Sequence, residues 1–569
     1  MCRIIRGLIA VIFVVAVTLQ TQLFAESPAS CEPRLVVLVV VDQMRADYLR
    51  HFANHFEAGG FGYLLEHGAF FADANVPYLS TETAPGHATI ATGCWPSQHG
   101  IIANKWWKTP EAARLIAAVD DDDVQQVGAT SGKSAAGKGQ SPRALLRPGI
   151  GDQMKLADPR SRVFSVSFKD RAAILLAGKT PDGVFWCDKP SGQFVTSSYY
   201  TERLPEYVAK LNAAGGLRAY AGRTWSALLP EQAYAGTRQC QSAWTEYLSK
   251  HEATLPHMLP VSGAQWDTAA SERVLGSPFA NEVVLGLAQS IMETEGLGLG
   301  PAADLLCISL SANDHIGHLY GPDSPEVMDI TVRTDRQLAR FFAFLDKRVG
   351  LQHCLLVLTA DHGISTSAYV TRETRLGGGL FSEEEAAERL NKTLVDAMSD
   401  EKAARPLVSI VNTPWVFCSP EFEEIDRRLN GRLGQAARDC LRQLPGVERV
   451  FRSDELAAAC GGGCDPDLTL AARSYYPGRS GQFCLLLKPF WQPFDKEDVA
   501  EHTGGSRSDR HVPIILCGPG VKVGTCHGPA DLTDIAVTIA ALLDIEPPVG
   551  AVGRVLSEGL DSTVVGGQR

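Results

Sequence analysis

Short runs of Val, Ile and Leu recur along the chain between segments that have helical periodicity. This alternation is typical of an α/β protein, because helices that cover both faces of a parallel sheet leave its strands without polar positions. The clearest predicted strands are residues 35–41, 163–166, 305–310, 355–358 and 514–516. We therefore expect an α/β fold of three layers, with a mostly parallel central sheet and helices on both faces.

One long helix is predicted between residues 324 and 350. Ser324 is a favourable N-cap, Pro325 suits the first helical position, and Gly350 ends the pattern. Apolar residues recur on one face of the intervening segment, which predicts that this face is buried. We expect this helix to be scaffold.

Three segments interrupt the alternation of strands and helices. In residues 192–277 and 371–497 the rhythm weakens, and we interpret both as insertions that cap one end of a single sheet. Residues 120–140 begin with four consecutive Asp and continue with Gly, Ser, Ala and Lys, which predicts a mobile surface loop. A metal site in the Asp run is an alternative that we consider weaker than a solvated turn.

Composition and charge limit the classes of partner. The chain has 569 residues, of which 45% are hydrophobic and 21% charged, so it can bury a large core. The formal net charge of -12 and a pI near 5.7 argue against nucleic acid as a partner, because binding to the phosphate backbone requires clustered Lys and Arg.

The N-terminal residues have the pattern of a signal peptide. Arg3 and Arg6 precede an apolar stretch at residues 8–19, and Ala25 offers a small residue for cleavage. We expect residues 1–25 to be removed, leaving residues 26–569 as a single catalytic domain in the periplasm or outside the cell, with no stable membrane insertion. An uncleaved anchor is the alternative, although the stretch is shorter than the ~20 residues that a spanning helix needs.

The cysteine count agrees with export to an oxidising compartment. Thirteen of the fourteen cysteines follow the expected cleavage point, and we expect some of them to form disulfides. The pair Cys460 and Cys464 is the best candidate for a local bridge, with a metal clip as the alternative.

Candidate catalytic groups follow the predicted strands. Asp42 follows residues 35–41, Asp314 comes shortly after residues 305–310, and Asp361 with His362 follows residues 355–358. Ligands of open α/β sheets bind beyond the carboxyl ends of the strands. Three carboxylates at one edge would repel one another unless cations lay between them, so the pattern predicts a metal site.

Two further features fit a metal-assisted reaction. Asp314 and His318 are four residues apart, which places both side chains on one side of a helical turn. Thr83 precedes Pro85 and Gly86 at the predicted beginning of a helix, where backbone amides attract anions. The alternative for Thr83 is an ordinary N-cap. As a nucleophile it would need a base or a metal, because a threonine hydroxyl is otherwise weak.

Taken together, the motifs resemble those of PafA-like alkaline phosphatases, in the same order from about residue 35 to residue 547. They are Val41-Asp42-Gln43-Met44-Arg45, Thr83-Ala84-Pro85-Gly86-His87, Thr92-Gly93, His99-Gly100, Lys169-Asp170-Arg171, the pair Asp314 and His318, Asp361-His362-Gly363, His502, and Asp509-Arg510-His511-Val512-Pro513.

The resemblance implies a zinc enzyme with two metal ions. One zinc would be held by Asp42, Thr83, Asp361 and His362. The other would be held by Asp314, His318 and His502. Since the family usually has His-Gly where this chain has His502-Thr503-Gly504-Gly505, His511 is the alternative to His502.

The resemblance also implies the substrate class, phosphate monoesters, which are small molecules. Asn104, Lys169 and Arg171 match the family's phosphate contacts, and the Lys and Arg replace the third, magnesium ion of other alkaline phosphatases. A monoester carries more negative charge than a diester, so additional cations favour it. Thr83 would form a phosphothreonine intermediate, and the same catalytic set would bind substrate. The alternative for residues 169–171 is a solvated loop.

Several alternatives remain open at this point. Residues 94–98 are similar to a sulfatase signature but have Gln98 where that signature has Arg, so we interpret them as scaffold. His87 and His99 are expected to be packed or hydrogen-bonded and not metal-bound. The competing functions are a phosphodiesterase or nucleotide pyrophosphatase, a phosphonate hydrolase, and a non-catalytic exported zinc-containing binding protein.

Overall fold

The computed structural model describes residues 32–108, 114–128, 138–238, 253–260, 266–398, 403, 406–459, 464–562 and 564. Its centre is an 11-stranded sheet. In spatial order the strands are β21 (Gly524–Asp531), β2 (Ala69–Asn75), β20 (Ile514–Cys517), β13 (Cys354–Thr359), β1 (Leu35–Val41), β12 (Asp304–Leu310), β7 (Val163–Ser167), β8 (Gly183–Asp188), β9 (Gln193–Ser197), β5 (Asp120–Val127) and β6 (Lys138–Gln140).

The five strands predicted from apolar runs are confirmed as β1, β7, β12, β13 and β20. The strands from β13 to β8 are parallel, and β20 runs antiparallel to both β13 and β2. Every residue of β1, β12 and β13 is buried. These three strands carry no polar alternation because both faces of the sheet are covered.

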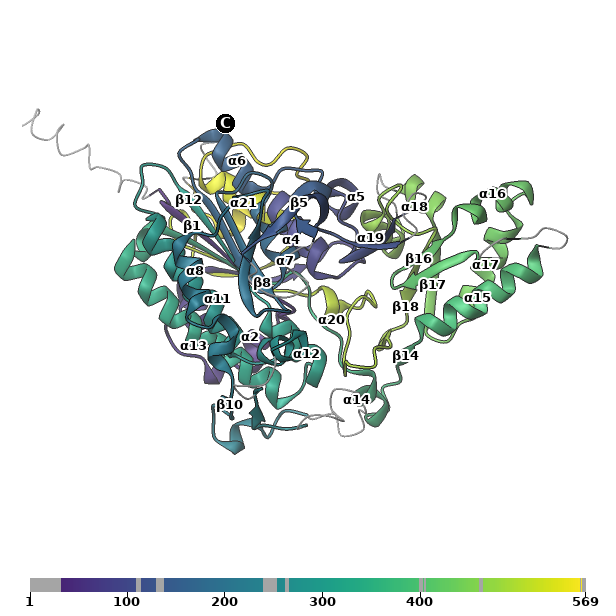
Figure 1. Cartoon of the computed structure of the whole chain (residues 1–569), viewed down its shortest axis with the longest axis horizontal. Helices are drawn as coiled ribbons and strands as arrows, with labels where there is room; N and C mark the ends of the chain where they lie inside the picture. Colours follow the sequence, from purple (N-terminus) through teal and green to yellow (C-terminus); the bar gives the residue numbers. More distant parts are fainter. Residues whose placement is uncertain are drawn as a thin grey trace, which may run out of the picture.

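Helices cover the two faces of the sheet (Figure 1). The first face carries α4 (Thr83–Thr92), α6 (Ile150–Ala157), α7 (Asp170–Ala177) and α21 (Asp534–Leu542). The second carries α3 (Phe61–His67), α8 (Glu206–Ala213), α11 (Phe279–Glu295), α12 (Ala312–Tyr320) and α13 (Pro325–Arg348). The α/β architecture expected from the sequence is thus confirmed.

The long predicted helix is α13. Its N-cap is Ser324, whose hydroxyl oxygen accepts a hydrogen bond of 3.2 Å from the backbone N–H of Val327. The predicted apolar face is buried at Val327, Ile330, Leu338, Phe341, Phe342 and Leu345.

Residues 371–497, which we call the cap, form a smaller lobe beside the main sheet (Figure 1). Its antiparallel sheet has the order β15 (Val408–Asn412), β16 (Trp415–Cys418), β18 (Phe483–Leu487) and β17 (Val447–Arg452). One face of this sheet packs on α15 (Glu383–Ala397), α16 (Pro420–Arg428) and α17 (Arg432–Arg442). The other face, which includes Trp415 and Phe417, shares a core with Trp106 and Ile174 of the body.

The other segment expected to cap the sheet, residues 192–277, is placed differently. It begins with β9, which is a strand of the central sheet, and continues with α8, which packs on α11. This part therefore extends the body, because β9 pairs antiparallel with β8 as the next strand along the chain.

The loop expected from residue 120 is wrong for residues 120–127, which form β5. This strand pairs with β6 and β9 at the sheet edge, and most of its acidic side chains stay in solvent. Asp121 is buried because it accepts hydrogen bonds from Ser141 and Arg143. Edge pairing thus outweighs the low strand propensity of Asp.

The ten described cysteines are all free thiols, so the expected disulfides are absent from the described part of the chain. The pair Cys460 and Cys464 cannot be judged, since Cys460 lies outside the described residues, as does the N-terminal segment with Ala25. Among the described helices, we find none with the length and apolar character required to cross a membrane.

Candidate functional site

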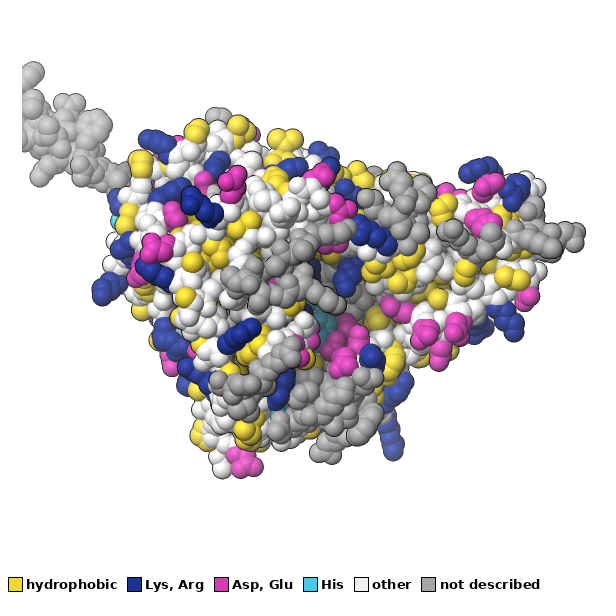
Figure 2. Space-filling model, in the orientation of Figure 1, with side chains coloured by type: hydrophobic (Ala, Val, Ile, Leu, Met, Phe, Trp, Pro, Cys, Tyr) yellow, Lys and Arg dark blue, Asp and Glu magenta, His cyan; other side chains and the backbone are white. Residues whose placement is uncertain are grey.

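The predicted site residues converge at one edge of the central sheet. Asp42 follows β1, Asp361 and His362 follow β13, Asp314 lies in α12 directly after β12, and Lys169 follows β7. Because β13, β1, β12 and β7 are neighbours in the sheet, their carboxyl ends deliver these side chains to one place. In Figure 2, histidine and acidic side chains are visible in a hollow between the body and the cap.

Thr83 is the first residue of α4 and is 1% exposed. The N-cap of this helix is Glu82, so Thr83 is not the N-cap and its hydroxyl is not used in capping. Instead, the Thr83 hydroxyl oxygen accepts a hydrogen bond of 3.2 Å from the ammonium of Lys169. The side chain is therefore directed into the charged cluster.

Asp42, Asp361 and His362 form the first group that can hold a metal ion. His362 Nε2 lies 3.7 Å from Asp42 Oδ1 and 3.5 Å from Asp361 Oδ2. These three atoms are buried. Asp42 Oδ1 and His362 Nε2 have no hydrogen-bond partner among the described residues, and Asp361 Oδ2 lies 3.2 Å from His87 Nδ1. Buried polar atoms are normally satisfied, so three such atoms facing one another fit a cation.

Asp314, His318 and His502 form the second group. Asp314 Oδ1 lies 3.2 Å from His318 Nε2 and 3.8 Å from His502 Nε2. His502 also packs against His362 of the first group, with ring centroids 3.9 Å apart and the rings tilted by 33°, so the two groups are adjacent. His511, the alternative to His502, faces the Ala72 carbonyl oxygen with Nε2 at 3.0 Å, away from both groups.

All three histidines in these groups have the same orientation. Nδ1 of His318, His362 and His502 donates a hydrogen bond to the backbone carbonyl of Ala500, Gly363 and Thr81, at 2.9, 2.9 and 2.5 Å. A carbonyl only accepts, so Nε2 is left with its lone pair toward the cluster. Hydrogen bonding of one imidazole nitrogen while the other ligates is the usual arrangement of metal-bound histidine.

The cluster also has an excess of buried negative charge. The Lys169 ammonium lies 2.7 Å from Asp42 Oδ2 and 2.5 Å from Asp314 Oδ2, and is the only lysine in contact with these carboxylates among the described residues. Burial, together with the charges of Asp314 and Asp361, raises the pKa of Asp42 well above its usual value. The charged form of Asp42 therefore remains unfavourable beside this ammonium, and the mixed His and carboxylate donors are ligands that zinc accepts.

The three residues that resemble phosphate contacts surround the same edge. Asn104 is held by its side-chain oxygen, which accepts a hydrogen bond of 2.8 Å from the Ala84 amide, so its NH₂ group is left for a ligand. Arg171 is at the beginning of α7, and its Nε is buried without a hydrogen-bond partner among the described residues. Lys169 differs from the expectation in that its ammonium contacts Asp42 and Asp314.

Two residues of the site were assigned no role from sequence. Gln43 donates hydrogen bonds to Asp361 of the first metal group and to Asp314 of the second. The Glu82 carboxylate accepts a hydrogen bond of 2.7 Å from the backbone N–H of Asn104, and burial raises the pKa of Glu82 to about 7. Gln43 belongs to a motif that carries the resemblance, and Glu82 adjoins Thr83, but neither signal indicates a role for the side chain.

The residues interpreted as scaffold have hydrogen-bond partners within the body. His87 Nδ1 lies 2.8 Å from the Thr83 carbonyl oxygen, and its Nε2 lies 2.8 Å from the Ser309 hydroxyl. His99 bonds to Thr89 and to a backbone amide. Cys94 donates to the Gly550 carbonyl oxygen.

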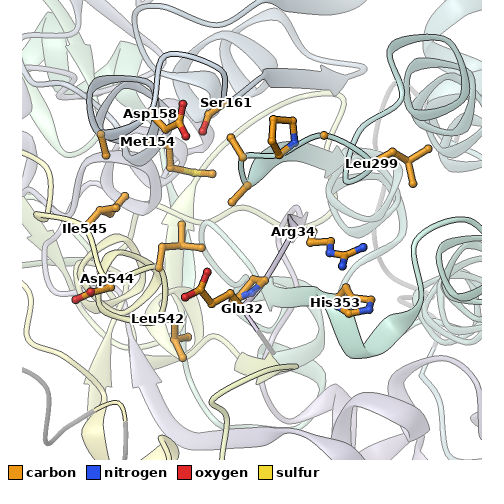
Figure 3. Close-up of a pocket in the computed structure, with 17 residues that line it drawn as sticks. Glu32, Arg34, Met154, Asp158, Ser161, Leu299, His353, Leu542, Asp544 and Ile545 are labelled. Carbon is orange, nitrogen blue, oxygen red and sulfur yellow. The ribbon is translucent and has the colours of Figure 1, made fainter. Parts of the chain in front are cut away.

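A large pocket lies elsewhere in the body (Figure 3). It has a volume of about 910 Å³ and is lined by Arg34, Ser161, Ala303 and His353 among others. These four residues precede β1, β7, β12 and β13, so the pocket is at the amino ends of the same strands. The pocket and the metal groups therefore lie at opposite ends of these strands.

Comparison with known proteins agrees with the geometry. Residues 36–409 match the family described as type I phosphodiesterase / nucleotide pyrophosphatase. The chain is 33% identical over 528 residues to the alkaline phosphatase PafA of Elizabethkingia meningoseptica, which covers 92% of this chain and 94% of PafA. It is 31% identical over 542 residues to the alkaline phosphatase PhoV of Synechococcus elongatus, with 95% and 94% covered.

A solved structure of PafA, in which one Thr, one Asn, one Lys and one Arg are substituted, aligns with a TM-score of 0.82 and 30% identity, covering 93% of this chain and 99% of that chain. The substituted Thr and Asn are 21 positions apart and the Lys and Arg two apart, as are Thr83 and Asn104, and Lys169 and Arg171. The chain therefore belongs to the type I phosphodiesterase / nucleotide pyrophosphatase family of the alkaline phosphatase superfamily, and within it to the alkaline phosphatases.

Proposed function

We propose that this alkaline phosphatase hydrolyses phosphate monoesters with Thr83 as the nucleophile, at a site that holds two zinc ions. The observation that carries the proposal is the set of buried ligand atoms that face one another on Asp42, Asp361 and His362, in the same cluster as the Thr83 hydroxyl; those of Asp42 and His362 have no hydrogen-bond partner among the described residues. A structural role would leave such atoms satisfied.

The residues divide between the two ions as the resemblance implies. Asp42, Thr83, Asp361 and His362 would hold one ion, and Asp314, His318 and His502 would hold the other. When bound, the two ions would lower the pKa of the threonine hydroxyl and of a water molecule, and would neutralise the leaving oxygen.

Two displacement steps account for hydrolysis. In the first, Thr83 Oγ attacks phosphorus in line, the bond to the leaving oxygen breaks, and a phosphothreonine forms. In the second, water attacks the phosphothreonine, which releases phosphate and restores the hydroxyl. The Lys169 ammonium, 3.2 Å from Thr83 Oγ, stabilises negative charge on that oxygen.

The cationic residues favour monoesters as substrates. Lys169, Arg171 and the free NH₂ group of Asn104 can contact the non-bridging oxygens of the transferring phosphoryl group. A dianionic monoester gains more from two cations than a singly charged diester does. Diester hydrolysis is the alternative that the family description raises.

Export is the remaining part of the proposal. The charged and apolar pattern before Ala25 supports a cleaved signal peptide and a periplasmic or secreted enzyme.

Metal removal tests the proposal directly. The purified protein should contain about two zinc ions, lose activity on an aryl phosphate when a chelator removes them, and regain activity when zinc returns. The readouts are elemental analysis and the rate of monoester hydrolysis on the same samples. Full activity in protein freed of metal would overturn the proposal.

A further inference from the structure

Gln43 lies between the two metal groups and links them. It follows Asp42 directly, is 3% exposed, and has a left-handed backbone with a φ of 68°. This conformation is uncommon for a residue other than glycine and is strained. Its persistence here means that surrounding contacts favour it.

Two hydrogen bonds from Gln43 end on different carboxylates. Its backbone N–H donates to Asp361 Oδ1 at 3.1 Å, and its side-chain Nε2 donates to Asp314 Oδ1 at 2.8 Å. An ionised carboxylate only accepts, so the amide must present its nitrogen to Asp314. One residue thereby fixes a carboxylate from each group.

The hydrogen bonds also determine which oxygens remain available. Asp361 Oδ1 accepts from the backbone amides of both Gln43 and His362, whereas Asp361 Oδ2 accepts from no backbone amide among the described residues and lies 3.2 Å from His87 Nδ1. The second oxygen is the one that faces His362 Nε2. The orientation of Asp361 therefore follows from the backbone turn at Gln43.

The shape of α12 accommodates this side chain. A Cβ atom at Gly317 would lie 1.8 Å from Gln43 Oε1, so only glycine at this position leaves room for the amide. Gly317 is adjacent to His318 in α12, the helix that carries Asp314. The amide of Gln43 is thus enclosed between α12 and the turn after β1.

We propose that Gln43 is a positioning residue that couples the two metal groups by orienting Asp314 and Asp361. This inference rests on the proposed function, since it concerns the ligands of the zinc ions. Partners that orient metal ligands typically affect metal affinity by about 10-fold to 100-fold.

Two substitutions separate positioning from packing. Gln43→Asn suits the left-handed backbone but is too short to reach Asp314, and Gln43→Glu keeps the length but replaces the donor by a like charge. We expect zinc to be retained about 10-fold less tightly in Gln43→Asn and still less tightly in Gln43→Glu. If Gln43 only filled space, the isosteric Gln43→Glu would retain zinc as well as the unsubstituted protein.

The measurement is the zinc content of each protein across a titration with chelator, with thermal unfolding as a check on folding. Gln337→Asn is the matched control, because Gln337 is buried in α13 and donates one amide hydrogen bond to Pro278 away from the site. Zinc retention equal to that of the unsubstituted protein in both Gln43 variants would overturn the inference. Absence of zinc from the unsubstituted protein would instead overturn the proposed function.

Discussion

The two ends of the central sheet contrast in what they bury. At the carboxyl ends of β1, β12 and β13, three aspartates are packed with histidines, and Asp42 Oδ1 and His362 Nε2 are buried without a hydrogen-bond partner in the described part of the chain. At the amino ends of the same strands, a pocket of about 910 Å³ is lined by residues such as Arg34 and His353, which are not among the groups that could hold a metal ion (Figure 3). Unsatisfied buried charge, and not the volume of a pocket, locates the chemistry in this fold.

The largest expected effect comes from the carboxyl end. Thr83→Ala removes the proposed nucleophile, so monoester turnover should fall by at least about a thousandfold while zinc remains bound by the other ligands. Turnover and zinc content are measured on the same preparation. Thr92→Ala at the far end of α4 is the control, since its hydroxyl donates to the Ala88 carbonyl oxygen and accepts from the Cys94 backbone N–H. Turnover close to normal in Thr83→Ala would exclude Thr83 as nucleophile.

A smaller effect distinguishes substrates at the same end. The double substitution Lys169→Ala with Arg171→Ala should lower kcat/KM for an aryl phosphate by about a hundredfold or more, and for a bis-aryl phosphate by less than about tenfold. The difference arises because the monoester carries the additional charge. Lys155→Ala, which removes a surface pair with Asp182, is the control. Equal losses on both substrates would contradict the assigned role.

The smallest effect is expected at the amino end. Arg34→Ala in the large pocket should leave kcat/KM for monoesters within about twofold, because exposed positions remote from the site contribute little. A tenfold loss of kcat/KM would contradict this expectation and would mean that the pocket contributes to activity. The same assay of monoester hydrolysis decides the question.

The central sheet was predictable from sequence because its signal is local. Strands such as β1 and β13 are continuous apolar runs, and the aspartates follow directly after them. Topology then brings these carboxyl ends together without further information. The proximity of His502 to His318 required the family resemblance, since 184 positions separate them.

Features that depend on distant pairing were not predictable. β5 contains four consecutive Asp, and only its pairing with β6 and β9 makes it a strand. The cap sheet is assembled from short strands of a weakly patterned segment. The contacts of Gln43 follow from a left-handed backbone that its sequence does not signal.

Because the cap lies between metal ligands in the chain, metal binding would also affect the stability of the fold. In the chain, the cap lies between His318, which precedes it, and His502, which follows it, and the Nε2 atoms of these two residues are 3.2 Å apart at the site. An ion held by His318 and His502 would close a chain segment that spans 184 positions, and closing a segment of this length removes conformational entropy from the unfolded chain. Bound metal would then stabilise the attachment of the cap to the central sheet. The stability of the folded protein and its activity would depend on the same few ligand atoms.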